Sequence, residues 1–489
     1  MIGRRVAAAA ALTMAVLSLA TLPSSPVAAA PTRPNIVLIV TDDQSIRMLG
    51  TMPHVRDLAA RGFTFQRAFV SNPQCCPSRA TILTGLYSHA TGVYSNGDAG
   101  GIDRLYGGWS AFRSEGLDAG GQRTLDNERR ALPVFLHAHG YQTGLFGKYL
   151  NHFGRANGAD VPAIPPGWDA WRSFDGPNGG YYDYWGRNEA GIRSVTRQYS
   201  TDLFGKRARD WLASTAQAPF FLYFAPYAPH GPSVAAPGDE GIGAPNGFAT
   251  PAFNEANVRD KPPYIRRLPL VDPDRMRSNY DREFASLVDV DRWIGRFEAA
   301  MRARGELRNT VFLFLSDNGT THGDHRWTGK FVPYERSIHV PLLIAGPWVV
   351  HGSTKDLVSN VDITPTVLDL AGLLAPDGTY TDTTTHRFDG VSLLPRAAGD
   401  ATFVAHPDPR APGGSSVLLE QLSHKTLPSY CGLRTPRWKY VLYRSGYQEL
   451  YDLARDPFEL RNIAKGKPHL AAKMLRNVRD TCLPPPPGW

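Results

Sequence analysis

Two short polar stretches of the sequence carry side-chain oxygens of the kind that bind metal ions. They are Thr41-Asp42-Asp43-Gln44 and Ser316-Asp317-Asn318-Gly319. The carboxylates of Asp42, Asp43 and Asp317 and the amide oxygen of Asn318 are hard ligands, which suit Ca²⁺ or Mg²⁺ better than zinc. Adjacent aspartates more often cap a helix or form a turn, so neither stretch indicates a metal site by itself. A metal site requires that the fold bring the two stretches together.

Each stretch follows a run of five apolar residues. Ile36 to Val40 precedes the first stretch, and Val311 to Leu315 precedes the second. A third run, Phe220 to Phe224, is followed by Ala228-Pro229-His230. Apolar runs without alternation are typical of strands buried on both faces of a parallel sheet. Since ligands of open α/β sheets bind beyond the carboxyl ends of the strands, we expect these polar residues to meet at one site.

Helical patterns separate these runs and indicate an α/β fold. The clearest spans Asp281 to Arg304, where an apolar stripe with helical spacing ends before Gly305. The sequence therefore predicts a large sheet flanked by helices. Two stretches rich in Gly or Pro, Asn96 to Gly121 and Pro232 to Pro273, are predicted to be long loops. Such loops either face substrate or are disordered.

The densest group of reactive residue types is Cys75-Cys76-Pro77-Ser78-Arg79, followed by Ala80-Thr81-Ile82-Leu83-Thr84-Gly85. A cysteine pair before a proline at the start of a helix can be purely structural. The pattern C-x-P-S-R followed by A-x-x-x-T-G nevertheless resembles the signature of the type I sulfatases, in which the first cysteine is oxidised to formylglycine. The resemblance extends over nearly the whole mature chain, and the subgroup it looks most like is that of the N-acetylglucosamine-6-sulfatases.

The resemblance implies a role for individual residues of this sequence. The implied metal ligands are Asp42, Asp43, Asp317, Asn318 and the modified Cys75. The implied catalytic residues, which surround the sulfate, are Cys75, Arg79, Lys148, His230 and Lys330. The implied ion is Ca²⁺, with Mg²⁺ as the alternative. A divalent ion would neutralise sulfate oxygens and lower the pKa of the nucleophile's hydroxyl group.

A covalent mechanism is also implied by the resemblance. Formylglycine hydrates to a geminal diol, and one of its hydroxyl groups attacks sulfur. The second hydroxyl lets the sulfated intermediate collapse to the aldehyde and release sulfate, which an unmodified cysteine or a serine could not do. The chain would then need a formylglycine-generating enzyme as a partner during maturation, and a sulfated small molecule or glycan as its substrate.

The sequence departs from many family members at Leu150, where they have a histidine two residues after the lysine. The run Gly147-Lys148-Tyr149-Leu150-Asn151 instead resembles the N-acetylglucosamine-6-sulfatases and the extracellular heparan sulfatases. Asn151 or His152 could fill the role of the missing histidine, and His325 could face substrate. We therefore expect a sulfated saccharide as substrate, with 6-O-sulfated N-acetylglucosamine as the first choice.

The implied fold is an alkaline-phosphatase-like sandwich, in which helices flank a large, mixed and mostly parallel sheet. This catalytic domain would occupy residues 31–400. Residues 401–489 would form a small C-terminal α+β subdomain, because residues 438–443 and 449–453 have the pattern of short antiparallel strands. Cys431 and Cys482 flank this subdomain, and in a secreted chain we expect them to form a disulfide. A bridge that involves Cys76 is the alternative.

Residues 1–30 have the features of a cleaved secretory signal peptide. Arg4 and Arg5 precede an apolar run from Val6 to Leu22, and small residues follow it. We therefore expect a secreted or extracytoplasmic product, and no later segment reaches membrane-spanning length. The formal net charge of +8 falls to +6 without the two arginines. This charge suits an acidic substrate or serves solubility, and no nucleic-acid-binding motif accompanies it, so we expect no nucleic-acid partner.

Three other functions remain open from the sequence. An arylsulfatase of broad specificity, or a phosphodiesterase or phosphonate hydrolase of the same superfamily, would use a similar site. A single oxygen-rich metal cluster, without the additional His and Asp ligands of a two-metal zinc site, favours sulfate over phosphate. A non-catalytic binder of sulfated glycans is disfavoured because Cys75, Arg79, both lysines and all the metal-ligand residue types are present.

Overall fold

The structure is a computed structural model. It describes residues 33–97, 105–115, 126–154, 164–176, 179–215, 219–381, 387–408, 410–411 and 414–489. The signal peptide predicted at residues 1–30 lies outside these residues, and it stays a prediction. Within the described ranges, no helix combines the length and the apolar character needed to cross a lipid bilayer.

The three predicted apolar runs form adjacent strands at the centre of the main sheet. β1 (Asn35–Thr41) lies between β8 (Thr310–Ser316) and β7 (Phe220–Ala225), and every residue of these strands is buried. β3 (Gln142–Gly147) pairs with β7, and β4 (Ala170–Phe174) pairs with β3. All these pairs are parallel, so the carboxyl ends of the five strands lie along one edge of the sheet.

Antiparallel pairs on both sides of this centre make the sheet mixed. In the described part of the chain the strand order is β11-β2-β12-β8-β1-β7-β3-β4-β5-β6, and β13 pairs in parallel with β2. The outer strands are β2 (Phe63–Phe69), β5 (Tyr184–Asn188), β6 (Arg193–Thr196), β11 (His339–Val340), β12 (Leu342–Ala345) and β13 (Gly352–Ser359). A large mixed sheet with a parallel centre confirms the predicted fold class.

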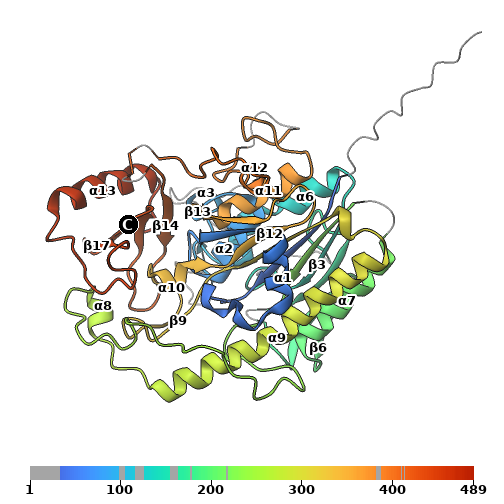
Figure 1. Cartoon of the computed structure of the whole chain (residues 1–489), viewed down its shortest axis with the longest axis horizontal. Helices are drawn as coiled ribbons and strands as arrows, with labels where there is room; N and C mark the ends of the chain where they lie inside the picture. The colour runs from blue at the N-terminus through green and yellow to red at the C-terminus, as the bar shows by residue number, and fades with distance from the viewer. Residues whose placement is uncertain are drawn as a thin grey trace, which may run out of the picture. The chain divides into compact units, whose positions relative to one another are not determined.

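Helices cover both faces of the sheet. Alternate residues of β1 point to opposite faces, so they belong to two different hydrophobic clusters. Ile36, Leu38 and Val40 belong to one hydrophobic cluster, whereas Val37 and Ile39 belong to another. The helices on the first side are α2 (Cys75–Thr84), α6 (Leu132–Ala138) and α11 (Ile363–Leu370). Those on the second side are α1 (Pro53–Arg61), α7 (Ser200–Ser214) and α9 (Pro273–Ala303) (Figure 1). The fold is thus the predicted sandwich of helices around a sheet.

The long helix α9 starts earlier than predicted. The prediction placed its first residue at Asp281, but the helix begins at Pro273. Asp272 caps it by accepting hydrogen bonds from two backbone N–H groups, and proline suits the first turn. The early turns are mostly polar, with Met276 and Tyr280 as their buried residues. The apolar stripe is therefore weakest where the helix begins. The N-cap residue Asp272 marks the start of the helix better than the stripe does.

The remaining described elements are short. The two predicted loops contain α5 (Gly108–Ser110), η2 (Ala111–Glu115) and α8 (Pro263–Arg266). Residues 98–104 and 116–121 of the first loop lie outside the described residues. The other short elements are η1 (Ile46–Thr51), α3 (Ser88–Thr91), η3 (Glu128–Arg130), η4 (Leu307–Asn309), β9 (Thr321–His322), β10 (Thr328–Gly329), α10 (Glu335–Ile338), η5 (Asn360–Asp362) and α12 (Leu394–Ala397).

A four-stranded antiparallel sheet forms in the C-terminal part of the chain, as predicted. Its strands, in spatial order, are β14 (Val417–Gln421), β15 (Tyr430–Arg434), β16 (Trp438–Tyr443) and β17 (Gln448–Asp452). Helix α13 (Pro468–Thr481) packs against this sheet, and a disulfide joins Cys431 of β15 to Cys482 at the end of the helix. The domain boundary at residue 400 stays a prediction.

Candidate active site

Four strand ends deliver the predicted functional residues to one edge of the sheet. Asp42 and Asp43 follow β1, and Asp317 follows β8. His230 lies in the segment after β7, and Lys148 comes directly after β3. Because these strands are parallel neighbours, side chains that are far apart in the sequence meet there, as the apolar runs predicted.

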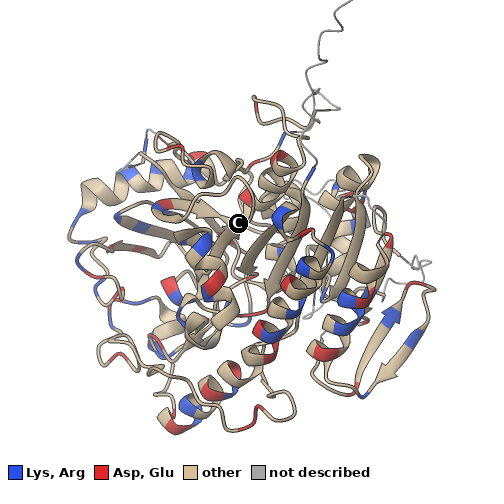
Figure 2. Ribbon diagram, turned by 45° about the vertical axis from the view of Figure 1, so that its right-hand side comes forward, with Lys and Arg blue, Asp and Glu red and all other residues tan. Residues whose placement is uncertain are grey.

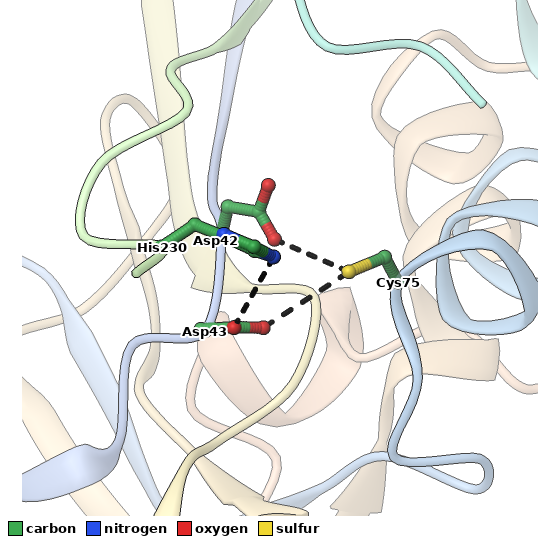
Figure 3. Close-up of side chains that lie close together, drawn as sticks. All are labelled: Asp42, Asp43, Cys75 and His230. Carbon is green, nitrogen blue, oxygen red and sulfur yellow. Dashed lines mark hydrogen bonds and ion pairs between the residues drawn. The ribbon is translucent and has the colours of Figure 1, made fainter. Parts of the chain in front are cut away.

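Cys75 lies at the same edge, but it belongs to a helix: it is the first residue of α2. Its Sγ lies 3.3 Å from Oδ1 of Asp42 and 4.0 Å from Oδ1 of Asp43 (Figure 3). Helix α2 is buried along its whole length and ends at Gly85, which has a left-handed φ of 67°. The N-terminus of a helix has free N–H groups and partial positive charge. It therefore favours an anion beside Cys75.

Asp43 connects the polar stretch after β1 with the one after β8. Its φ of 69° is a left-handed conformation, which aspartate tolerates better than most residues. Its N–H donates to Oδ1 of Asp317 at 3.1 Å, and its own Oδ1 accepts from Nδ2 of Asn318 at 2.6 Å and from Lys330. Its Oδ2 lies 3.6 Å from Nε2 of His230. Counting Cys75 as well, this carboxylate thus contacts residues from four separate segments.

Two buried cations neutralise the carboxylates of Asp42 and Asp317. Nζ of Lys148 donates to Oδ2 of Asp42 at 2.5 Å, and Nε of Arg79 donates to Oδ2 of Asp317 at 2.8 Å. Arg79 also donates to the backbone oxygen of Lys148 at 2.9 Å. Gly147 permits this arrangement, because a Cβ there would lie 1.9 Å from a backbone oxygen of β7. Only glycine lets β3 bring the lysine this close.

Lys330 supplies the third cation, from the end of β10. Its Nζ donates to Sγ of Cys75 at 2.7 Å and also to Oδ1 of Asp43. The indole N–H of Trp327 donates to the backbone oxygen of Lys330 at 2.9 Å, which fixes the turn that carries the lysine. The ammonium group therefore lies between the cysteine and the carboxylate.

Burial and these ion pairs shift the pKa values of the site. Burial would raise the pKa of Asp42, but Lys148, together with other cations, holds it well below its usual range. Burial and the neighbouring Asp42 raise the pKa of Asp317 to about 6, although Arg79 opposes this shift. Burial, followed by Asp42, also raises the pKa of the Cys75 thiol. Three carboxylates face three cations in this cluster, so it is electrically balanced before any ligand binds.

His230 presents one particular ring nitrogen to the cluster. Its Nδ1 lies 2.7 Å from the backbone oxygen of Gly231. A carbonyl oxygen can only accept, so Nδ1 carries the proton and Nε2 of the neutral ring is the acceptor. Burial lowers the pKa of His230 more than Asp43 raises it, which keeps the ring neutral. The unprotonated Nε2 therefore faces the carboxylates and Cys75.

The donor atoms fit an oxygen-binding divalent cation. Ligand atoms of four residues lie within 4.8 Å of one another, namely those of Asp42, Asp43, Cys75 and His230. Oδ1 of Asn318 is buried and accepts no hydrogen bond from the described residues, which is unusual for a buried amide oxygen. Each oxygen of Asp317 accepts one hydrogen bond and retains a second lone pair. This oxygen-rich set suits Ca²⁺ or Mg²⁺.

Two residues that the prediction omitted help to hold the site. Oγ of Ser316 donates to the backbone oxygen of Asn318 at 2.9 Å and accepts from the N–H of Gln44 at 2.9 Å. The ring of Tyr227 packs against His230 with centroids 4.6 Å apart and lies 5.7 Å from Nζ of Lys148. Their closeness in the sequence to predicted site residues was the only available signal.

The two predicted substrate residues lie outside the contacts described above. His325 is buried, its Nδ1 lies 2.6 Å from Oε2 of Glu255, and its ring packs against Tyr334. Asn151 is also buried, and its backbone oxygen accepts from the N–H of Trp109 at 2.8 Å. Roles in substrate binding for Asn151 and His325 stay predictions.

Comparison with known proteins agrees with this geometry. The family model described as Sulfatase matches residues 34–373, a range that contains every residue of the cluster. N-acetylglucosamine-6-sulfatase of Homo sapiens is 31% identical over 495 residues, which cover 92% of this chain and 84% of the relative. Arylsulfatase of Volvox carteri is 30% identical over 498 residues, which cover 89% of this chain and 72% of the relative.

A solved structure shares the fold. It is BT4656 in complex with its substrate D-glucosamine-2-N,6-O-disulfate, and it superposes with a TM-score of 0.69 at 22% identity. The match covers 92% of this chain and 98% of that chain. The likeness in fold therefore extends over most of the chain.

Proposed function

The chain belongs to the formylglycine-dependent sulfatase family and is therefore a sulfuric ester hydrolase, and we propose that its substrate is a sulfated saccharide. The proposed reacting unit is 6-O-sulfated N-acetylglucosamine. The observation that carries this proposal is the 31% identity with human N-acetylglucosamine-6-sulfatase over 92% of the chain. The run from Gly147 to Asn151, which resembles that subgroup, supports it.

Cys75 is the proposed nucleophile after its conversion to formylglycine. Its place at the N-terminus of a buried helix, beside Asp42 and Lys330, supports this role. The hydrated aldehyde supplies one hydroxyl for attack on sulfur and a second for release of the product. The helix N-terminus and the two lysines then attract the sulfate ester to that residue.

Asp42, Asp43, Asp317, Asn318 and residue 75 are the proposed metal ligands. The unsatisfied amide oxygen of Asn318 and the cluster of carboxylates support this assignment. Ca²⁺ or Mg²⁺ would supply Lewis-acid polarisation of the sulfate group. Since three carboxylates already face three cations, a divalent ion would make the site net positive. Such a site favours binding of an anionic ester.

The surrounding side chains have distinct proposed tasks. Lys148 and Lys330 bind sulfate oxygens, and an ammonium group can also donate a proton to the departing sugar alkoxide. Arg79 acts as a positioning residue, because its guanidinium group holds the carboxylate of Asp317. His230 accepts a proton from a hydroxyl on residue 75, since its unprotonated Nε2 faces that residue.

Maturation and location complete the proposal. A formylglycine-generating enzyme would modify Cys75, and the predicted signal peptide at residues 1–30 would direct the chain out of the cytoplasm. The expected disulfide partners, Cys431 and Cys482, are bonded to each other, which is compatible with an oxidising compartment.

The second candidate function is that of a broad-specificity arylsulfatase. The 30% identity with the arylsulfatase of Volvox carteri favours it. An arylsulfatase differs from a saccharide sulfatase in the group that is attached to the sulfate. An aryl ester lacks the binding energy that a saccharide offers away from the reacting centre.

The test compares kcat/KM for three substrates, which are 6-O-sulfated N-acetylglucosamine, an aryl sulfate and an aryl phosphodiester. The proposal predicts the highest value for the sulfated sugar, and Cys75→Ala protein purified in parallel controls for contaminating sulfatases. A clear preference for the aryl sulfate would instead establish the arylsulfatase. A preference for the phosphodiester would favour phosphodiester hydrolysis, which the sequence left open.

A further inference from the structure

A cavity of about 550 Å³ opens beside the candidate active site. One wall includes Gly231, which directly follows His230. Another wall includes Glu283 of α9, whose Oε2 lies 2.6 Å from Nε2 of His322 in β9. One wall therefore belongs to the segment after β7, and the other contacts the segment after β8. Both segments leave the sheet at the edge where the site lies. The cavity is an extension of that edge.

Helix α9 places two arginines in this cavity. Arg275 and Arg282 line it together with Ser278, and these three residues share one helix face because they are three, four and seven positions apart. Both arginines are exposed, and neither forms an ion pair with an acidic residue in the described part of the chain. The acidic residue of the cavity, Glu283, is bonded to His322. The cavity is therefore positively charged.

The guanidinium group of Arg282 is held in place by neutral partners. It donates to Oγ of Ser278 at 2.7 Å and to Oδ1 of Asn279. Its charge therefore remains available, while its orientation is fixed. Arg277, Arg292 and Arg296 of α9 differ, because each of them pairs with an aspartate, as Arg277 does with Asp281 at 2.8 Å. Figure 2 shows that α9 carries both basic and acidic residues.

A second cavity, of about 620 Å³, shares Ser233, Ser278 and Arg282 with the first. Val234 and Ile242, both exposed apolar side chains, also line it. Such side chains can pack against the apolar face of a sugar ring. The acidic Glu240, Asp274 and Asp281 line it too, the last paired with Arg277, so the net positive charge is confined to the first cavity. The two cavities thus form one continuous groove that starts next to His230.

We propose that this groove binds the saccharide unit attached to the sulfated sugar, and that Arg275 and Arg282 recognise a negative charge on that unit. The planar guanidinium group pairs well with a sulfate or a carboxylate. The inference rests on the proposed saccharide substrate and adds to it a preference for an acidic neighbour.

The test uses three disaccharides that share a 6-O-sulfated N-acetylglucosamine unit. The attached unit is a neutral hexose, a hexuronic acid or a sulfated hexose, so the series separates carboxylate from sulfate recognition. Wild-type protein should show the higher kcat/KM on one or both acidic disaccharides. Arg282→Gln should lower that value about tenfold, the effect of one charge-assisted hydrogen bond, and should change the value for the neutral disaccharide less than twofold.

Arg302→Gln is the matched control, because it removes the same charge from an exposed position of α9 outside the groove. It should leave all three values unchanged. Arg275→Gln provides a second test if Arg282→Gln lowers the melting temperature. An equal loss on neutral and acidic substrates, or no loss in either variant, would overturn the groove assignment while the saccharide substrate stands. If wild-type protein cleaves an aryl sulfate but none of the disaccharides, the proposed function itself fails.

Discussion

Nζ of Lys330 lies 2.7 Å from Sγ of Cys75, although the two residues are far apart in the sequence. Burial lowers the pKa of this lysine, but Asp43 and its other acidic neighbours raise it well above the usual value. The lysine is therefore in its charged ammonium form at neutral pH beside the residue proposed to attack sulfur. A fixed positive charge at this position stabilises negative charge that develops during the reaction.

Loss of this charge should cost activity. We expect Lys330→Gln to lower kcat by about 100-fold or more, the range for a residue that aids proton or charge transfer directly. The exposed lysine of β13 supplies the control, and Lys355→Gln should retain full activity. Initial rates and melting temperatures of both variants provide the measurement. A Lys330→Gln protein with wild-type kcat would remove this lysine from the mechanism.

Chelation should abolish turnover, and Ca²⁺ or Mg²⁺ should restore it better than Zn²⁺, because the ligands are carboxylate and amide oxygens. We expect Asp43→Asn to weaken metal binding, measured as a smaller rise in melting temperature when Ca²⁺ is added. The control is Asp57→Asn, at an exposed position of α1. Fully active protein that contains no metal by elemental analysis would contradict the proposed metal site.

The two neighbouring cysteines should behave differently. Cys75→Ala and Cys75→Ser should abolish turnover, because neither variant presents the thiol that the proposed formylglycine-generating enzyme would oxidise. Cys76 is buried in the core on the α2 side of the sheet, so Cys76→Ala should cost about 1 kcal/mol of stability and leave most of the activity. If Cys76→Ala were folded but inactive while Cys75→Ala remained active, the cysteine proposed for modification would be wrong.

The ion pair between His406 and Asp362, 2.8 Å apart, should make stability depend on pH. Burial lowers the pKa of His406, but Asp362 raises it by more, so the pKa in the folded state lies above the ordinary histidine value of about 6.5. The pair therefore contributes fully below about pH 6.5, and its contribution is lost as the pH rises through the folded-state pKa.

We expect His406→Gln to lower the free energy of unfolding by about 1 kcal/mol at pH 6, and by less at higher pH. Chemical denaturation of both proteins across this pH range provides the measurement. His351→Gln, at an exposed position, controls for the loss of a histidine. A difference between His406→Gln and wild type that does not change with pH, or that grows as the pH rises, would contradict this account.

The central strands could be predicted because the signal for them is local. The run from Ile36 to Val40 is apolar on both faces, and only a strand covered on both sides accommodates it. No local pattern in the sequence predicts that Lys148 and Lys330 lie in the site. A single lysine is usually a solvated surface charge, so only the resemblance to a family distinguished these two from the other lysines.

Contacts across long sequence separations could not be predicted. His325 packs with Glu255, which lies 70 positions earlier in a stretch without a regular pattern. No periodicity indicates such a pair, so the sequence left His325 as a candidate for substrate binding. The start of α9 was missed for another reason, because an N-cap at Asp272 with polar early turns gives a weak apolar signal.

The most direct test of the central proposal is mass spectrometry of the peptide that contains Cys75. The protein should be produced in cells that contain a formylglycine-generating enzyme. We predict that this peptide is lighter by about 18 Da than its thiol form, because the thiol becomes an aldehyde, and that a hydroxylamine reagent labels it. Cys76 in the same peptide should remain a thiol. A fully active preparation in which Cys75 is an unmodified thiol would contradict the proposed mechanism.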